Sequence, residues 1–209
     1  MKILAISASG RRTGNINQIC SKIIEGAASN GHETEIINLY DYSIKHCIGC
    51  LECTKTRKCV LKDDFNELYK KEEDADLIIM ATPVYCHSVP GALKDFIDRN
   101  CHAVIPYMDI DKGTSYFGKL KFVNEYLKKF KANVPFKNKR FITVIACSNP
   151  SKNGDDIKSV SSLMKKFVEG EMGGKIFKCI KCTDTLFQLN PRNLDKVHEQ
   201  ALNLGSSIK

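Results

Sequence analysis

Residues 83–99 of this 209-residue chain read PVYCHSVPGALKDFIDR, and they follow the apolar run Leu77–Ala81. An uninterrupted apolar run of this length is typical of a strand that is buried on both faces of a parallel sheet. Pro90-Gly91 then begins a helix, because proline is favoured in the first helical turn. A strand, a short loop and a helix start together form the crevice at the carboxyl edge of an open α/β sheet, where ligands bind.

This segment resembles the flavin-ring loop of the NADPH-dependent FMN reductase and iron-sulfur flavoprotein superfamily at nearly every position. The resemblance implies a flavodoxin-like fold with FMN at the carboxyl edge of the sheet. It also implies that the flavin ring lies against this loop and near the end of the fourth expected strand. The residues expected there are Pro83, Val84, Tyr85, Cys86, His87, Ser88 and Ser148.

A second loop, near the N-terminus, points to the same cofactor. Lys2–Ser7 is a short apolar strand, and residues 8–15 lead from it into an amphipathic helical pattern. Backbone N–H groups at such a helix start can bind a phosphate. The loop resembles the superfamily's phosphate loop, commonly Gly-Ser-Pro-Arg-x-x-Gly-Asn-Thr, which implies that it holds the phosphate of FMN. The expected FMN ligands are Ser7, Ser9, Arg11, Arg12, Thr13, Gly14, Asn15 and Ile16.

Three positions of this loop depart from the superfamily pattern: Ala8 replaces glycine, Gly10 replaces proline and Ile16 replaces threonine. Loss of the threonine hydroxyl removes one hydrogen bond to the phosphate, which is worth about 1 kcal/mol. We therefore expect FMN to bind more weakly, by up to about tenfold, but still to bind.

The alternation of apolar runs and amphipathic patterns predicts a single domain over residues 1–209. Strands are expected near 2–8, 34–39, 76–82, 140–147 and 175–182. Helices are expected near 16–29, 64–73, 90–101, 118–131, 155–170 and 191–207. This alternation predicts a three-layer α/β sandwich with helices on both faces of a five-stranded parallel sheet. The resemblance implies the strand order 2-1-3-4-5, and residues 102–138 are expected as a helical insertion that forms a partial lid or a dimer contact.

Ten cysteines provide the second chemical signal, and four of them have the spacing C-x2-C-x2-C-x5-C in a loop at 45–62. These four are Cys47, Cys50, Cys53 and Cys59. Two thiolates separated by two residues can converge on one metal centre from a tight turn, and the fourth can return as a further ligand. The resemblance to iron-sulfur flavoproteins implies a [4Fe-4S] cluster. Four thiolates also suit zinc, and relatives can carry a similar loop without a metal, so all three alternatives stay open on the sequence alone.

The other cysteines and histidines favour structural roles. Cys86 and His87 adjoin each other, but neighbouring loop residues rarely aim at one atom, and the sequence shows no third group to orient the imidazole. We expect both to line the flavin and no side chain to act as a catalytic nucleophile. Cys179 and Cys182 are three residues apart in an expected strand, so their side chains should point to opposite faces.

The formal charge of +8 comes from 32 basic and 24 acidic residues, and the basic residues concentrate in 119–140. No helix-turn-helix, zinc-finger or RNA-binding signature accompanies this charge, so we expect no nucleic-acid partner. No apolar run approaches the roughly 20 residues that span a bilayer. The apolar start ends before Arg11-Arg12, which does not fit a signal peptide. A cytoplasmic protein without membrane contact is expected, and the resemblance favours a homodimer or homotetramer.

These observations favour an FMN-dependent oxidoreductase of the NADPH-dependent FMN reductase type. The expected donor is NAD(P)H or a ferredoxin-like protein, and the expected acceptor is a small molecule such as a quinone or an oxygen species. In one alternative, the chain is a cluster-free FMN or quinone reductase. In a second, it is an electron carrier between a [4Fe-4S] cluster, FMN and a protein partner, without NAD(P)H turnover. In a third, it is a binding module for zinc and another phosphate ligand. The chain lacks a complete Gly-x-Gly-x-x-Gly fingerprint, so NAD(P)H would have to stack over FMN.

Overall fold

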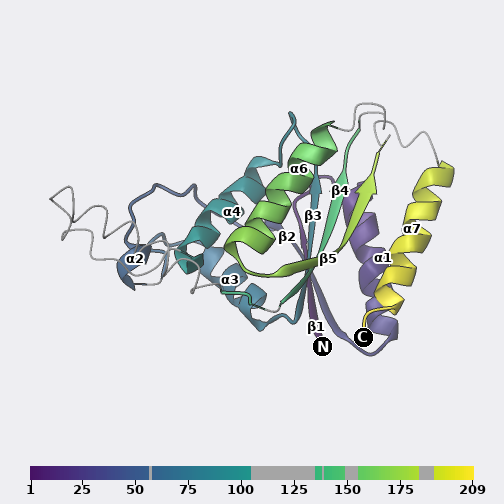
Figure 1. The fold of residues 1–209 in the computed structure, drawn as a ribbon, viewed down its shortest axis with the longest axis horizontal. Helices are drawn as coiled ribbons and strands as arrows, with labels where there is room; N and C mark the ends of the chain where they lie inside the picture. Colours follow the sequence, from purple (N-terminus) through teal and green to yellow (C-terminus); the bar gives the residue numbers. More distant parts are fainter. Residues whose placement is uncertain (57, 105–134, 138, 149–154, 184–190) are drawn as a thin grey trace.

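The computed structural model is a three-layer α/β sandwich built on one five-stranded parallel sheet (Figure 1). It describes residues 1–56, 58–104, 135–137, 139–148, 155–183 and 191–209. The strands are β1 (Lys2–Ser7), β2 (Glu33–Asn38), β3 (Leu77–Pro83), β4 (Arg140–Ala146) and β5 (Lys175–Cys182). Their spatial order is β2-β1-β3-β4-β5, which confirms the predicted order.

Helices cover both faces of this sheet, as the sequence predicts. The longer helices are α1 (Asn15–Ser29), α3 (Phe65–Asp74), α4 (Gly91–Val104), α6 (Asp155–Lys165) and α7 (Pro191–Ser206). Two short helices, η1 (Leu39–Asp41) and α2 (Cys53–Thr56), follow β2. Figure 1 shows α1 and α7 on one face, and α3, α4 and α6 on the other. Among the described residues, no helix is long and apolar enough to cross a membrane.

Each face of the sheet has its own hydrophobic core, because side chains alternate along a strand. In β1, Ile3 points to the core under α1 and α7, whereas Leu4 points to the core under α3, α4 and α6. The same alternation places Cys179 against the α3–α4–α6 core and Cys182 in the α1–α7 core, which agrees with the expectation for this pair. The helices of the α1–α7 pair approach closely, since a Cβ on Gly205 would lie 2.0 Å from the carbonyl oxygen of Ile23.

One expected helix is divided in the structure, and another falls outside the described residues. The helix expected at 155–170 is divided, because α6 ends at Lys165 and a π-helical segment, η4 (Lys166–Glu171), follows it. The π-helical turn is wider than an α-helical turn, because the Met172 N–H donates to the carbonyl of Phe167, five residues earlier. The side chains of Met172 and Phe167 are both buried. The helix expected at 118–131 and most of the insertion expected at 102–138 fall outside the described residues.

A buried carboxyl group lies between α3 and α4. Among the described residues, the two carboxyl oxygens of Glu72 and the Oδ1 of Asn100 have no hydrogen-bond partner. Burial raises the pKa of Glu72 to about 8, although the neighbouring Asn100 and Lys139 oppose this shift. Glu72 is therefore protonated at neutral pH, where its O–H can donate to a neighbouring acceptor such as Asn100.

This burial makes the stability of the fold depend on pH. The folded state holds the Glu72 proton more tightly than the unfolded chain does, so the free energy of unfolding should fall between about pH 4.5 and pH 8. Glu72→Gln resembles the protonated form and should be more stable than the wild type at pH 8 by about 2–4 kcal/mol. Urea unfolding at pH 5 and pH 8 measures the difference. The control is Glu73→Gln at the exposed neighbouring residue. Its free energy of unfolding should depend on pH as that of the wild type does. If the free energy of unfolding changes equally between pH 5 and pH 8 in Glu72→Gln and in the wild type, the Glu72 carboxyl does not titrate in this range.

Candidate functional site

The loop between β1 and α1 has its carbonyl oxygens held by side-chain amides. The amide donors belong to Asn17, Gln18 and Asn38. They bind, at 2.7–3.2 Å, the carbonyl oxygens of Ser9, Arg11, Arg12 and Thr13. Ser7 is buried beneath the loop, and its Oγ donates to Asn17 Oδ1 at 2.5 Å, which orients the Asn17 amide. The carbonyl groups of the loop are thus turned toward the protein.

The N–H groups of the same loop are left available. Within the described residues, no acceptor is bound by the backbone N–H groups of Arg12, Thr13, Asn15 and Ile16. They lie at the N-terminus of a 15-residue helix, where the helix dipole favours negative charge. Asn15 also has a buried Oδ1 without a partner, which can accept a hydrogen bond from a ligand hydroxyl. Together these groups fit a ligand that combines an anion with hydroxyl groups.

The two arginines of this loop differ in their partners. Both terminal nitrogens of Arg12 bind the carboxylate of Asp41 in η1, and this contact lowers the pKa of Asp41. The Arg11 guanidinium is exposed and forms no hydrogen bond or ion pair with any described residue. Of the two expected ligands, Arg11 is therefore the one with its charge available to an anion.

The loop after β3 ends in a strained two-residue turn. Tyr85 and Ser88 exchange two backbone hydrogen bonds of 2.9 Å, and Cys86 and His87 between them have φ angles of 46° and 64°. Positive φ at both central residues is typical of a type I′ turn, which normally contains Asn-Gly. Each of these two side chains costs about 1–2 kcal/mol in a left-handed conformation. Such strain is concentrated at functional sites.

His87 is oriented by a residue that lies far away in the sequence. Its Nδ1 contacts the carboxylate of Asp156 at the start of α6, and this hydrogen bond raises the pKa of the exposed His87. The expectation that no third group orients this imidazole is therefore wrong, because Asp156 follows 69 residues later. Among the described contacts, none joins Cys86 to His87, so the geometry shows no nucleophile pair.

The remaining residues of the expected flavin site lie where the sequence places them. Pro83 ends β3, and the Val84 N–H donates to the carbonyl of Ala146 at 2.8 Å, which holds the loop beside the end of β4. Ser148 follows β4 by two residues and is half-buried. The flavin-ring loop and Ser148 therefore share the carboxyl edge of the sheet with the loop before α1.

Tyr40 is a further candidate that sequence reasoning missed. Its ring lies 3.4 Å from the position of a Cβ on Gly10, so it covers the loop before α1. Burial raises the pKa of Tyr40, and the nearby Tyr85 adds to this shift. The two side chains are 47% and 45% exposed, so both rings are accessible to a ligand. The signal in the sequence was its place directly after the second expected strand.

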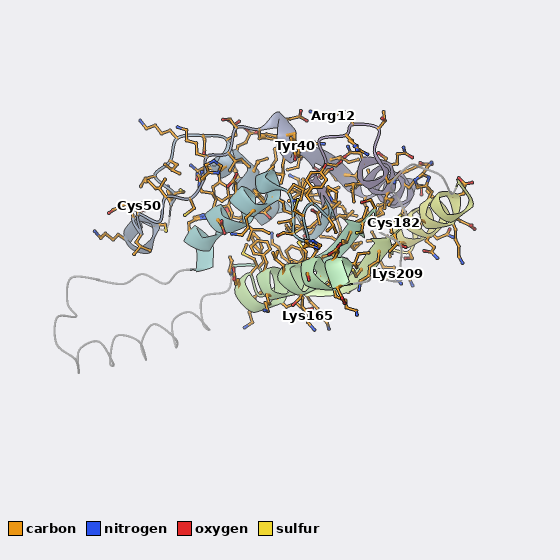
Figure 2. All side chains as sticks on the ribbon, turned by 90° about the horizontal axis from the view of Figure 1, so that it is seen from above. Arg12, Tyr40, Cys50, Lys165, Cys182 and Lys209 are labelled. Atoms are coloured by element: carbon orange, nitrogen blue, oxygen red, sulfur yellow. The ribbon has the colours of Figure 1, made fainter. Side chains whose placement is uncertain are left out.

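The four loop cysteines line a single cavity against α4. The cavity measures about 50 Å³, and its wall includes Cys47, Cys50, Cys53, Cys59, Arg99 and His102. All four cysteines are free, and burial together with the neighbouring cysteines raises the pKa of Cys53. Among the described residues, no three metal-binding side chains converge on one ion position. Figure 2 shows Cys50 at one end of the molecule, apart from Arg12 and Tyr40.

A buried ion pair holds this cysteine loop in place. Arg99 donates from Nη1 and Nη2 to the two carboxylate oxygens of Asp63, at 2.6 and 2.9 Å, and both side chains are at most 1% exposed. Asp63 also accepts the N–H groups of Lys45 and Phe65, and Arg99 donates to the Lys45 carbonyl. Although burial opposes ionisation, these hydrogen bonds lower the pKa of Asp63. Asp63 therefore accepts the N–H of Phe65, the first residue of α3, whereas Asp64 accepts the Ser43 N–H.

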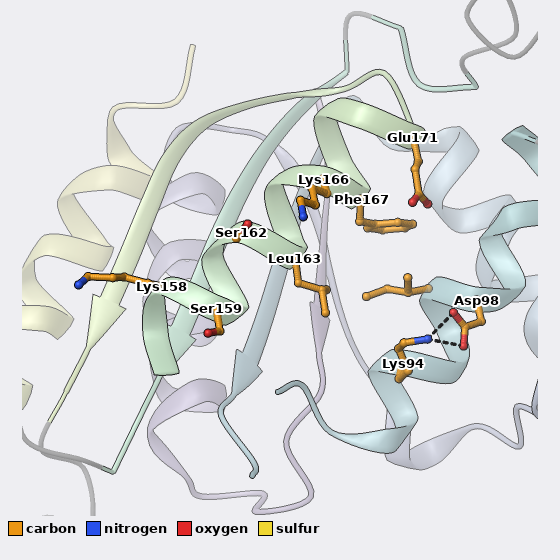
Figure 3. A pocket seen from close by; sticks show the side chains of 10 residues that line it. Lys94, Asp98, Lys158, Ser159, Ser162, Leu163, Lys166, Phe167 and Glu171 are labelled. Atoms are coloured by element: carbon orange, nitrogen blue, oxygen red, sulfur yellow. Dashed lines mark hydrogen bonds and ion pairs between the residues drawn. The ribbon is translucent and has the colours of Figure 1, made fainter. Parts of the chain in front are cut away.

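A larger groove lies outside both expected sites. It measures about 680 Å³ and separates α4 from α6 and η4 (Figure 3). Leu163 and Phe167 line it, and Lys94 and Asp98 at its edge form an ion pair of 2.6 Å with each other. None of the residues predicted to bind FMN or a metal lines this groove.

Comparisons with known proteins agree with this geometry. The family model for NADPH-dependent FMN reductase matches residues 1–120. An iron-sulfur flavoprotein of Methanocaldococcus jannaschii is 40% identical over 100 residues, which are 48% of this chain and 52% of that protein. An iron-sulfur flavoprotein of Archaeoglobus fulgidus is 41% identical over 100 residues, which are 48% of this chain and 49% of that protein. The chain thus aligns with about half the length of these curated relatives.

A solved structure extends the likeness to the whole chain. It is an NAD(P)H:quinone oxidoreductase from Methanothermobacter marburgensis, with a TM-score of 0.73 and 14% sequence identity. The superposition covers 100% of this chain and 99% of that chain. At this identity, the likeness shows the fold alone.

Proposed function

Because the chain belongs to the NADPH-dependent FMN reductase family, we propose that it is an FMN-dependent oxidoreductase. Residues 9–16 hold the FMN phosphate, and residues 83–88 hold the ring. The observation that carries this proposal is the loop before α1, whose carbonyls are tied back while its N–H groups stay available. This arrangement supports a phosphate ligand, because it combines several donors with the positive end of a helix.

Different residues around this loop bind different parts of FMN. Arg11 supplies the free positive charge, and the buried Oδ1 of Asn15 accepts a hydroxyl of the ribityl chain. Tyr40 covers the loop at Gly10, and Tyr85 lies near it, so both rings are available to pack against the ligand. When bound, FMN supplies the redox chemistry by accepting electrons from a donor and passing them to an acceptor. The chain itself binds and orients, and no side chain has to act as a nucleophile.

The donor and the acceptor are proposed from the family and from the likeness to quinone reductases. NAD(P)H is the proposed donor to FMN and a quinone the proposed acceptor, both reaching the ring at the open turn of residues 85–88. A ferredoxin-like protein is the alternative donor, and it would meet the cysteine loop. That loop exposes Ile48, Leu51 and Val60, and it also carries the exposed residues Lys45, Lys58 and Lys62. Exposed apolar residues and positive charge in one loop suit a small acidic redox protein.

The cysteine loop supports a second cofactor, a [4Fe-4S] cluster held by the four loop cysteines. Four thiols around one cavity are the donor set of such a cluster, which supplies single-electron exchange when bound. Four thiols are the donor set of both zinc and the cluster. The cluster is proposed over zinc because two relatives that the chain matches, from Methanocaldococcus jannaschii and Archaeoglobus fulgidus, are iron-sulfur flavoproteins.

Substitution of the two arginines tests the phosphate site. Arg11→Gln should weaken FMN binding by about 10-fold to 100-fold, because it removes a charge-assisted hydrogen bond. Arg12→Gln is the matched control and should change the affinity much less, since Asp41 already binds that guanidinium. Quenching of FMN fluorescence on titration with the protein measures both. An equal or larger loss of affinity in Arg12→Gln would show that the assignment of the two arginines is wrong.

Anaerobic reconstitution with iron and sulfide tests the cluster. The wild type should take up about four of each per chain. Cys59→Ser should lose most of this iron, whereas Cys20→Ser should keep it, because Cys20 is fully buried in α1. Iron and sulfide analysis after gel filtration measures the uptake, and bound FMN reports that each variant is folded. Wild-type protein that binds FMN but no iron would leave a cluster-free reductase as the function.

A further inference from the structure

Two nitrogens of the Arg99 guanidinium form hydrogen bonds that hold the cysteine loop, and the third has no partner among the described residues. Nη1 and Nη2 bind Asp63 and the carbonyl of Lys45, as described above. The third nitrogen, Nε, is buried and has no hydrogen-bond partner among the described residues. A buried N–H without a partner loses its hydration and gains nothing in return, which costs about 1–3 kcal/mol. Such a donor is retained where an acceptor is supplied from elsewhere.

The guanidinium of Arg99 lies at the cysteine cavity. Arg99 lines this cavity together with the four cysteines, and its guanidinium interacts with Cys59. The Cζ of Arg99 lies 4.7 Å from the centre of the Phe65 ring. The contacts to Phe65 and Asp63 hold the guanidinium in place beside the cysteine loop.

We propose that Arg99 positions the fourth cysteine, so that its Nε–H donates to the Sγ of Cys59 when that sulfur binds the cluster. This inference rests on the proposed function, because it needs the [4Fe-4S] cluster in the cavity. Arg99 touches a ligand rather than the iron, so it is a positioning residue. Such outer partners orient the ligands of a metal centre and adjust its properties.

The fold gives this role a physical basis. Asp63 and the Lys45 carbonyl hold the arginine from the two ends of the cysteine loop, so the donor is in place before a cluster arrives. Four thiolates bring negative charge into the cavity, and the positive guanidinium of Arg99 forms part of its wall. A hydrogen bond and a positive charge next to a cluster sulfur stabilise the reduced form, and they raise the reduction potential.

Three variants test the inference on anaerobically reconstituted full-length protein. Arg99→Gln removes the charge and the Nε–H, whereas Arg99→Lys keeps a charge without the guanidinium geometry. Arg140→Gln is the control, since Arg140 begins β4 and contacts the C-terminal Lys209 rather than the cavity. The measurements are iron content, the rate of iron loss to a chelator and the midpoint potential of the cluster from a redox titration followed by electron paramagnetic resonance. Bound FMN serves as the check on folding.

Arg99→Gln should lose iron about 10-fold to 100-fold faster than the wild type, and its cluster should have a more negative midpoint potential. Arg99→Lys should recover part of the potential but not the rate of iron loss. Arg140→Gln should match the wild type in both. If Arg99→Gln binds FMN and matches the wild type in iron loss and potential, Arg99 has no role toward the cluster. If the wild type itself takes up no iron, the cluster proposal fails and this inference fails with it.

The assignment to Cys59 has its own test. If Arg99 acts through Cys59, the double variant Arg99→Gln/Cys59→Ser should lose iron no faster than Cys59→Ser alone. In contrast, Arg99→Gln should accelerate iron loss further when it is combined with Cys47→Ser. Equal acceleration in both backgrounds would show that the arginine does not act through Cys59.

Discussion

The buried ion pair between Arg99 and Asp63 is the contact on which the arrangement of both candidate sites depends. It joins the second half of α4 to the start of α3 and to the backbone at Lys45. Removing one partner would leave the other charge buried and uncompensated, which typically costs 3–5 kcal/mol. Because α4 begins directly after the loop that follows β3, the same helix adjoins that loop at its start and the cysteine cavity in its second half.

The two sites are prepared for their ligands to different degrees. In the loop before α1, side-chain amides hold the carbonyl oxygens, and among the described residues the N–H groups of Arg12, Thr13, Asn15 and Ile16 bind no acceptor. The turn at Cys86 and His87 stores backbone strain and is held to α6 by Asp156. The cysteine loop, in contrast, has gathered its thiols around one cavity without bringing three of them to one ion position within the described residues. The hydrogen bonds of Arg99 to Asp63 and to the Lys45 carbonyl are already formed.

Much of this architecture could be predicted from the sequence, because the three central strands are short apolar runs and the longer helices have an apolar face. The sheet order followed from the resemblance of residues 83–99 to a known superfamily, and the structure confirms it. What local patterns missed are contacts between distant segments. Asp156 orients His87 across 69 residues, and Asp63 pairs with Arg99 across 36. The π-helical turn after Lys165 was also missed, because the apolar pattern continues through it.

The central claim is that the loop before α1 recognises the phosphate of FMN, and a comparison of FMN with riboflavin tests it most directly. Riboflavin carries the same ring and ribityl chain without the phosphate. Isothermal titration should give one FMN per chain and an affinity for riboflavin that is at least about 100-fold lower, since several charge-assisted hydrogen bonds are lost. Equal affinities for the two ligands would contradict the account, because the N–H groups of this loop would then contribute nothing to binding.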